Sequence, residues 1–81
     1  MDVILSKNAT KQFDRLPKKE QSKIRKKLIA LKEDPYSGKR LSGDLIGLFS
    51  FRSWPYRIIY EIKKKRVEVS KIVHRQGAYR N

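Results

Sequence analysis

The stretch that decides the fold is Phe49-Ser50-Phe51-Arg52-Ser53-Trp54-Pro55-Tyr56-Arg57-Ile58-Ile59-Tyr60-Glu61-Ile62. Apolar and polar residues alternate on both sides of Ser53-Trp54-Pro55, which is typical of two half-buried strands joined by a tight turn. The main apolar set of the second strand has one parity: Tyr56, Ile58, Tyr60 and Ile62. Because successive side chains of a strand point to opposite faces, Arg52 and Arg57 are predicted to stand together on the other, open face. The hairpin is therefore predicted to present an anion-binding site.

The chain before this hairpin predicts a short strand and two helices. Asp2 to Leu5 reads as a strand, and Ser6 is expected to cap a helix that begins at Lys7. The buried stripe of this helix has three- and four-residue spacing: Ala9, Phe13 and Leu16. Pro17 separates it from a second helix, predicted from Lys18 to about Lys32. The two helices are expected to lie antiparallel.

The remaining segments predict connections and one more strand. Asp34-Pro35-Tyr36-Ser37-Gly38 breaks the second helix. Leu41 to Leu48 contains glycines but lacks the order of a phosphate-binding loop, so it is expected to be a structured connection. A basic turn at Lys63-Lys64-Lys65 leads into a strand from Arg66 to Val73. The C-terminal residues, 74–81, are too few for a further helix.

The resulting order is strand, helix, helix, strand, strand, strand (β-α-α-β-β-β). It predicts a single α+β domain over residues 1–81, in which both helices cover one face of a mostly antiparallel sheet. The other face is expected to be open and to carry the two arginines of the hairpin.

Charge is the strongest feature of the composition. The 81 residues include 21 Lys and Arg against 8 Asp and Glu, a formal net charge of +13. Such a domain attracts polyanions, of which nucleic acid is the first candidate and an acidic protein the second. There is no cysteine, which excludes disulfides and thiolate metal sites. No apolar stretch is long enough to cross a bilayer and no signal-peptide pattern is visible, so the expected location is the cytoplasm, with no membrane partner.

Three segments together carry a resemblance to a known family. They are Leu41-Ser42-Gly43-Asp44-Leu45-Ile46-Gly47, the hairpin core Phe51-Arg52-Ser53-Trp54-Pro55-Tyr56-Arg57-Ile58-Ile59-Tyr60, and the C-terminal His74-Arg75-Gln76-Gly77-Ala78-Tyr79. Over nearly its whole length the chain resembles the RelE-type toxins of the RelE/ParE superfamily, from type II toxin–antitoxin systems. The resemblance implies a metal-independent endoribonuclease without a small-molecule cofactor. Its target would be mRNA in the decoding site of the 70S ribosome, and a cognate antitoxin would neutralise it.

The resemblance also implies a set of catalytic residues. Arg57 and Arg75 match the family's arginines, and Tyr79 matches its C-terminal tyrosine. Cleavage by attack of a ribose 2′-hydroxyl on the adjacent phosphate needs a base, charge stabilisation and protonation of the leaving oxygen. A guanidinium can hold two phosphoryl oxygens in its fork, and a tyrosine can stack on a splayed base. Further basic residues are expected to bind RNA: Arg52, Lys71 and Arg80.

The chain departs from the family where a catalytic base is expected. Leu48 and Ser50 occupy positions at which better-known members carry lysines. His74 is the candidate substitute, because an unperturbed imidazole titrates near pH ~6.5. His74 and Arg75 would point to opposite faces of a continuous strand, so only a kink or a strand end lets both reach one site.

Two further functions stay open at the level of sequence. ParE-type relatives share the fold but inhibit DNA gyrase without acting as nucleases, and the missing lysines favour that alternative. A basic RNA-binding module without catalysis is the other. Trp54, in the turn of the hairpin, is predicted to be a buried hydrophobic plug, with a base-stacking platform or an antitoxin contact as alternatives.

Overall fold

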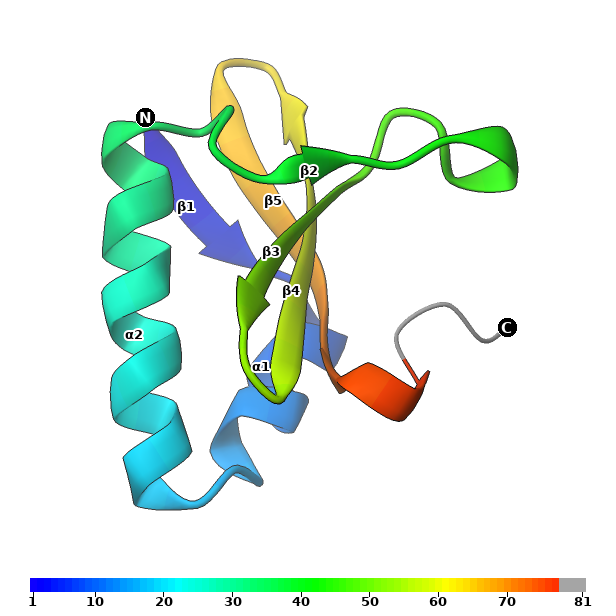
Figure 1. Cartoon of the computed structure of the whole chain (residues 1–81). Coiled ribbons are helices and arrows are strands. Elements are labelled where there is room, and N and C mark those ends of the chain that lie inside the picture. Colours follow the sequence, from blue (N-terminus) through cyan, green and yellow to red (C-terminus); the bar gives the residue numbers. More distant parts are fainter. Residues whose placement is uncertain (78–81) are drawn as a thin grey trace.

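The computed structural model describes residues 1–77. Helices and strands follow one another as β1 (Asp2–Leu5), α1 (Lys7–Asp14), α2 (Lys18–Glu33), β2 (Lys39–Arg40), β3 (Phe49–Ser53), β4 (Tyr56–Lys63) and β5 (Arg66–His74), as Figure 1 shows. Two single-turn 3₁₀ helices lie at Gly43–Leu45 and Arg75–Gly77. The predicted α+β class and the order of its main elements are confirmed.

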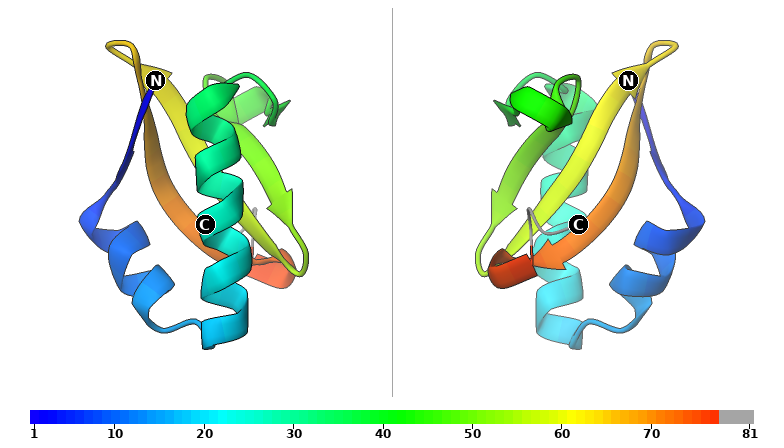
Figure 2. Two further views of the ribbon diagram at one scale, coloured as in Figure 1. Left: turned by 90° about the vertical axis from the view of Figure 1, so that its left-hand side faces the viewer. Right: turned by 90° about the vertical axis from the view of Figure 1, so that its right-hand side faces the viewer.

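The strands form one five-stranded sheet in the order β1-β5-β4-β3-β2. Only the β1–β5 pair is parallel among the pairings of residues 1–77, so the sheet is mostly antiparallel, as predicted. The left view of Figure 2 looks onto α2 with the strands behind it, and the right view shows α2 behind the strands. Residues from both helices enter the same core as the sheet, so α1 and α2 cover one face.

The core joins these helices to the inner face of the sheet. Its buried members are Ala9, Ile24, Leu31, Phe49, Ile58, Tyr60, Val67, Val69 and Ile72. Helices α1 and α2 supply the first three, of which Ala9 belongs to the stripe predicted for the first helix. Ser6 caps α1 as expected, because its Oγ accepts a hydrogen bond from the backbone N–H of Ala9 at 3.0 Å.

The predicted β3–β4 hairpin forms, and the structure gives its register. Phe49 lies opposite Tyr60 and Phe51 opposite Ile58, all on the core side, and the rings of Phe49 and Tyr60 stack at 5.1 Å. On the other side Arg52 lies directly opposite Arg57. The prediction that alternation would pair these two arginines is therefore confirmed.

Strand β5 contains a β-bulge that was not predicted from the sequence. Ile59 pairs with Lys71 but the next residue, Tyr60, pairs with Val69, which leaves Ser70 as an extra residue. This bulge resets the alternation, so that Val69 and Ile72 both face the core although they are three positions apart. The backbone N–H of Ile72 donates to Oε1 of Gln12 on α1, at 2.8 Å.

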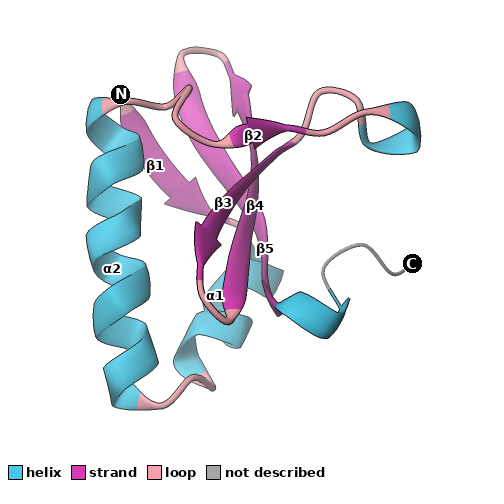
Figure 3. Ribbon diagram, viewed as in Figure 1, coloured by secondary structure: helices cyan, strands magenta, loops and turns pink. Residues whose placement is uncertain are grey.

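Two short elements also differ from the expectation. Lys39 and Arg40 form β2, opposite Ser50 and Phe49, where a connection without a strand was predicted. Arg75–Gly77 forms a 3₁₀ turn, where the chain was predicted to contain no further helix. A two-residue strand and a single turn are too short to leave a periodic pattern in a sequence. Figure 3 shows that residues 41–48, with their own 3₁₀ turn, extend away from the body of the domain.

Candidate functional site

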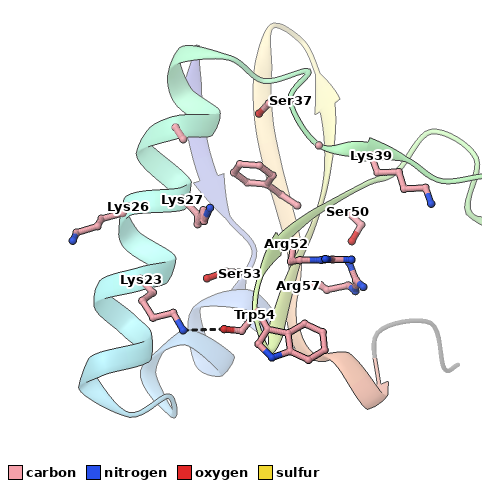
Figure 4. Close-up of a pocket in the computed structure, with 13 residues that line it drawn as sticks. Lys23, Lys26, Lys27, Ser37, Lys39, Ser50, Arg52, Ser53, Trp54 and Arg57 are labelled. Carbon is pink, nitrogen blue, oxygen red and sulfur yellow. Dashed lines mark hydrogen bonds between the residues drawn. The ribbon is translucent and has the colours of Figure 1, made fainter.

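A groove of about 990 Å³ runs between α2 and the β3 side of the sheet. It collects cations from the helix and from β2, β3 and β4: Lys23, Lys26, Lys27, Lys39, Arg52 and Arg57. The described residues that line it include no acidic side chain. Figure 4 shows that the residues Lys39, Ser50, Arg52 and Arg57 extend on the side of the sheet away from α2. The groove thus carries the charge expected of a site for a polyanion.

The arginine pair is the centre of this cationic surface. Arg52 is exposed and Arg57 is half-buried. Side chains directly opposite each other in an antiparallel pair have Cβ atoms about 4.5–5.5 Å apart, and like charges in that position repel. A bound anion would relieve the repulsion, and guanidinium groups suit the oxygens of a phosphate because they can donate two parallel hydrogen bonds.

Trp54 links a third arginine, Arg75, to the Arg52–Arg57 pair. Its indole is 53% exposed, so the predicted buried plug is wrong. Cζ of Arg52 lies 5.9 Å from the ring centroid and Cζ of Arg75 lies 5.0 Å from it, both within range of a cation–π contact. The backbone N–H of Arg75 also donates to the carbonyl of Pro55 at 2.7 Å. The turn of the hairpin therefore holds Arg75 by its backbone and by its side chain. Figure 1 shows the 75–77 turn on the side of the sheet away from α2.

A contact from α2 holds the β3–β4 turn in position. Nζ of Lys23 donates to the backbone carbonyl of Trp54 at 2.8 Å, drawn as a dashed line in Figure 4. Lys23 also pairs with Glu20 at 3.4 Å. One of the groove lysines is thus a structural link between helix and hairpin rather than an unengaged cation.

His74 lies on the opposite face of the sheet from Arg57. It is the last residue of β5 and lies opposite Tyr56, whose ring packs against the core. The two rings make an edge contact at 5.5 Å, and Nδ1 of His74 accepts a hydrogen bond from the N–H of Gln76 at 3.4 Å. Its register puts it on the helix-covered face, whereas the chain turns at Arg75 toward Trp54. Strand β5 does end at His74, as was required for His74 and Arg75 to reach one site. This strand end does not turn His74 to the face that carries Arg57.

The remaining predicted site residues are Lys71, Tyr79 and Arg80, and of these only Lys71 lies within residues 1–77. Lys71 is exposed and lies opposite Ile59, on the same face as Arg57. Tyr79 and Arg80 lie outside the described residues. Ile59 is only 4% exposed, so the face that was predicted to be open has a buried patch beside the arginines.

Ser50 occupies this buried patch. It lies between Lys39 on β2 and Ile59 on β4, it is 4% exposed, and its Oγ has no hydrogen-bond partner. Ser53, 3% exposed, has an unpartnered Oγ as well. Buried polar atoms normally find a partner, so these two hydroxyls in the groove lining are exceptions that call for an explanation.

Two further findings concern metal ions and membranes. Within residues 1–77 His, Asp and Glu side chains do not gather in a group of three or more that could hold a metal ion. Neither α1 nor α2 has the length and apolar character to traverse a lipid bilayer, and the same holds for every helix in the described part of the chain.

Comparison with family models assigns this small α+β domain to a class, the toxins of type II toxin–antitoxin systems. A model of the family described as ParE toxin of the type II toxin–antitoxin system parDE matches residues 3–79. The chain is therefore a member of this family, within the RelE/ParE superfamily, and the resemblance noted from the sequence is confirmed. A comparison with curated protein sequences finds no significant match.

Solved structures support the same class. The toxin–antitoxin complex RelBE2 of Mycobacterium tuberculosis matches with 26% identity and a TM-score of 0.83, covering 90% of this chain and 95% of that chain. A YoeB/ParE toxin of Agrobacterium tumefaciens matches with 21% identity and a TM-score of 0.80, over 91% and 98% of the two chains. The intact E. coli RelBE complex matches with 19% identity and a TM-score of 0.75, over 90% and 94%. The last two likenesses establish the fold alone.

Proposed function

We propose that this toxin is a ribosome-dependent mRNA endoribonuclease that inhibits translation. The observation that carries the proposal is the pairing of Arg52 with Arg57 on the outer face of the hairpin, with Arg75 joined to Arg52 through the ring of Trp54. Arg52 and Arg57 line a groove in which the described residues include no acidic side chain. Such an arrangement suits an RNA phosphate whose negative charge increases during a reaction.

The proposed reaction is transesterification at one phosphodiester. The ribose 2′-oxygen forms a bond to phosphorus while the bond from phosphorus to the 5′-oxygen breaks. The 2′-hydroxyl gives its proton to a base and the leaving 5′-oxygen takes up a proton, so none is consumed overall. The products are a 2′,3′-cyclic phosphate and a 5′-hydroxyl.

Each predicted site residue has a role in this proposal. Arg57 and Arg75 donate hydrogen bonds to the phosphoryl oxygens of the transition state. Tyr79 orients the 2′-hydroxyl or stacks on a base, and Arg52, Lys71 and Arg80 bind flanking phosphates. His74 remains the candidate base, although its register on the helix-covered face requires the substrate or the chain end to move toward it. The ribosome would supply the alignment that a site without a nearby strong base lacks.

Inhibition of DNA gyrase is the second candidate function. It is favoured by the family match to ParE toxins and by the position of His74 on the opposite face of the sheet from Arg57. In that case the cationic groove would bind an acidic protein surface rather than RNA, and the arginines would contribute affinity rather than rate.

A cognate antitoxin is the proposed protein partner, acting in the cytoplasm. The M. tuberculosis and E. coli relatives were solved as toxin–antitoxin complexes. Because this chain carries a net charge of +13, we expect its antitoxin to be acidic or amphipathic and to be encoded beside it.

Purified components test the proposal. The toxin is mixed with a defined mRNA, either free or bound in a 70S ribosome, and the cut ends are mapped. We expect cuts with 2′,3′-cyclic phosphate and 5′-hydroxyl ends on the ribosome-bound message and little cleavage of free RNA. Intact mRNA in both mixtures, together with trapped gyrase–DNA adducts when gyrase is added, would favour the second function.

A further inference from the structure

The short strand β2 puts an ammonium beside the arginine pair. Lys39 lies directly opposite Ser50, so its side chain is on the same face of the sheet as Ser50, Arg52 and Arg57. It is exposed and lines the same groove. Figure 4 shows its side chain extending in the same direction as the two arginines.

The geometry of the strands brings Lys39 within reach of one substrate group. Arg52, two residues along β3 from Ser50, is its diagonal neighbour, a relation in which Cα atoms are typically about 7–8 Å apart. Two strand spacings of about 4.8 Å separate β2 from β4, which carries Arg57. Long lysine and arginine side chains can bridge such a gap when both contact one phosphate.

The unpartnered hydroxyl of Ser50 lies between these cations. It is buried beneath the surface that Lys39 and the arginines border, and its Oγ has no hydrogen-bond partner. The Oγ has almost no exposed surface, so a phosphoryl oxygen above Ser50 would accept from the ammonium of Lys39 and from a guanidinium group rather than from this hydroxyl.

We propose that Lys39 is a further catalytic residue, which donates from its ammonium to a non-bridging oxygen of the phosphate that is cleaved. The inference rests on the proposed nuclease function. Lys39 stabilises the charge of the phosphorane from the β2 side and Arg57 stabilises it from the β4 side. It is neither the base nor the acid of the reaction.

Charge-matched variants test this role. Lys39→Gln removes the ammonium and Lys39→Arg keeps the charge. Arg40→Gln removes the adjacent cation, whose guanidinium lies 5.5 Å from the ring centroid of Phe49 and not in the groove. Lys65→Gln removes a cation from the β4–β5 turn, and Arg57→Ala tests the nuclease site itself. Two quantities are measured: the single-turnover cleavage rate at saturating programmed ribosomes, and the Kd for ribosomes whose mRNA carries a 2′-deoxyribose at the cleavage position.

The proposal predicts a loss in rate rather than in binding. Removal of one such donor lowers a rate by about 100- to 1,000-fold, so we expect Lys39→Gln to lose at least about tenfold and Lys39→Arg to recover most of it. The two control variants should stay within about threefold, and the Kd should change little. A Lys39→Gln rate equal to that of Lys65→Gln, beside an inactive Arg57→Ala, would overturn the role of Lys39 alone. A weaker Kd with an unchanged rate would make it a binding residue instead. Full activity of Arg57→Ala would overturn the proposed nuclease site, and this inference with it.

Discussion

Trp54 is the residue on which the arrangement of the site depends. Its exposed ring contacts the guanidinium groups of Arg52 and Arg75, which come from strand β3 and from the turn after β5. An exposed cation–π contact contributes about 0.5–1 kcal/mol. About half of the surface of Trp54 remains exposed, so we expect it to position the arginines more than to stabilise the fold.

We predict that Trp54→Ala lowers the proposed cleavage about 5- to 30-fold, which corresponds to the loss of about 1–2 kcal/mol from the two contacts. Trp54→Phe should recover part of the rate, because a phenyl ring keeps a face for the guanidinium groups. Thermal unfolding should change little for both variants. The measurement is the single-turnover rate on programmed ribosomes. A Tm loss as large as the rate loss, without recovery by phenylalanine, would mean that Trp54 is structural.

Tyr60 illustrates a residue that serves only the fold. Its hydroxyl donates to the carbonyl of Pro35 at 2.7 Å and accepts from the N–H of Gly38 at 3.1 Å, which fixes the segment that leads into β2. Burial raises the pKa of the Tyr60 phenol above its ordinary value, since the charged form would lose its hydration. The Gly38 hydrogen bond opposes this rise to a smaller extent, and the negative charge of Asp34 adds a still smaller increase.

The raised pKa of Tyr60 predicts a stability that falls in alkali. Below pH 10.0, the ordinary tyrosine value, the phenol is neutral in both states and its contribution is complete. As the pH rises further, the unfolded chain ionises first, so the free energy of unfolding decreases until the folded-state pKa is passed. Urea titrations from pH 8 to pH 11 should therefore show a steeper decline for the wild type than for Tyr60→Phe. Parallel declines would contradict the assignment.

At the scale of elements, α1 holds the irregular part of β5. The strand continues past the end of β1, and the first helix covers this stretch. Ser6 donates from its N–H to the carbonyl of Val69 at 2.8 Å and from its Oγ to that of Ser70 at 3.1 Å, while Gln12 accepts from Ile72. These backbone hydrogen-bonding groups of β5 are thereby paired with α1 and its N-cap instead of with another strand.

Gln12→Ala is predicted to destabilise the domain by about 1–3 kcal/mol, because the N–H of Ile72 would lose its partner in a partly buried position. Lys11→Ala on the same helix is the matched control, since Lys11 is exposed, and it should change the free energy of unfolding by less than about 0.5 kcal/mol. Chemical denaturation measures both. Equal values for the two variants would show that the Gln12 hydrogen bond contributes nothing.

The main elements could be predicted from the sequence because each carries a repeated pattern. The alternation from Phe49 to Ile62 identified the hairpin and the shared face of Arg52 and Arg57. The β5 bulge could not be predicted, since an inserted residue removes the period on which the reading depends. Strand β2 was missed because two residues have no period, and with it the position of Lys39 was missed.

At the scale of the whole molecule, the site is assembled by contacts between distant segments. The sequence indicated that Arg75 and the hairpin belong together only through a family resemblance. The structure supplies the physical link, which is the turn at Trp54 and Pro55. The face on which His74 lies depends on the register of β5 after its bulge. Because the bulge could not be predicted from sequence patterns, neither could the face of His74.

Charge is also arranged over the whole molecule. Toward the β4–β5 turn the open face carries the ion pairs of Glu61 with Lys63 and of Glu68 with Arg66. Toward the β3–β4 turn the described lining of the groove is cationic only. Acidic side chains therefore accompany the cations at one end of the sheet, whereas the charged side chains of the described groove lining at the other end are all basic, which favours a polyanionic partner.

The most direct test of the proposed function is primer extension on a translated message after the toxin is induced in cells, with the wild type compared with Arg57→Ala. Lys65→Ala controls for the loss of one positive charge. The account predicts cuts within the translated region for the wild type and for Lys65→Ala. For Arg57→Ala it predicts a loss of about 100-fold or more, because one donor to the transition state is removed. Growth arrest with intact messages, or the same cuts from Arg57→Ala, would contradict it.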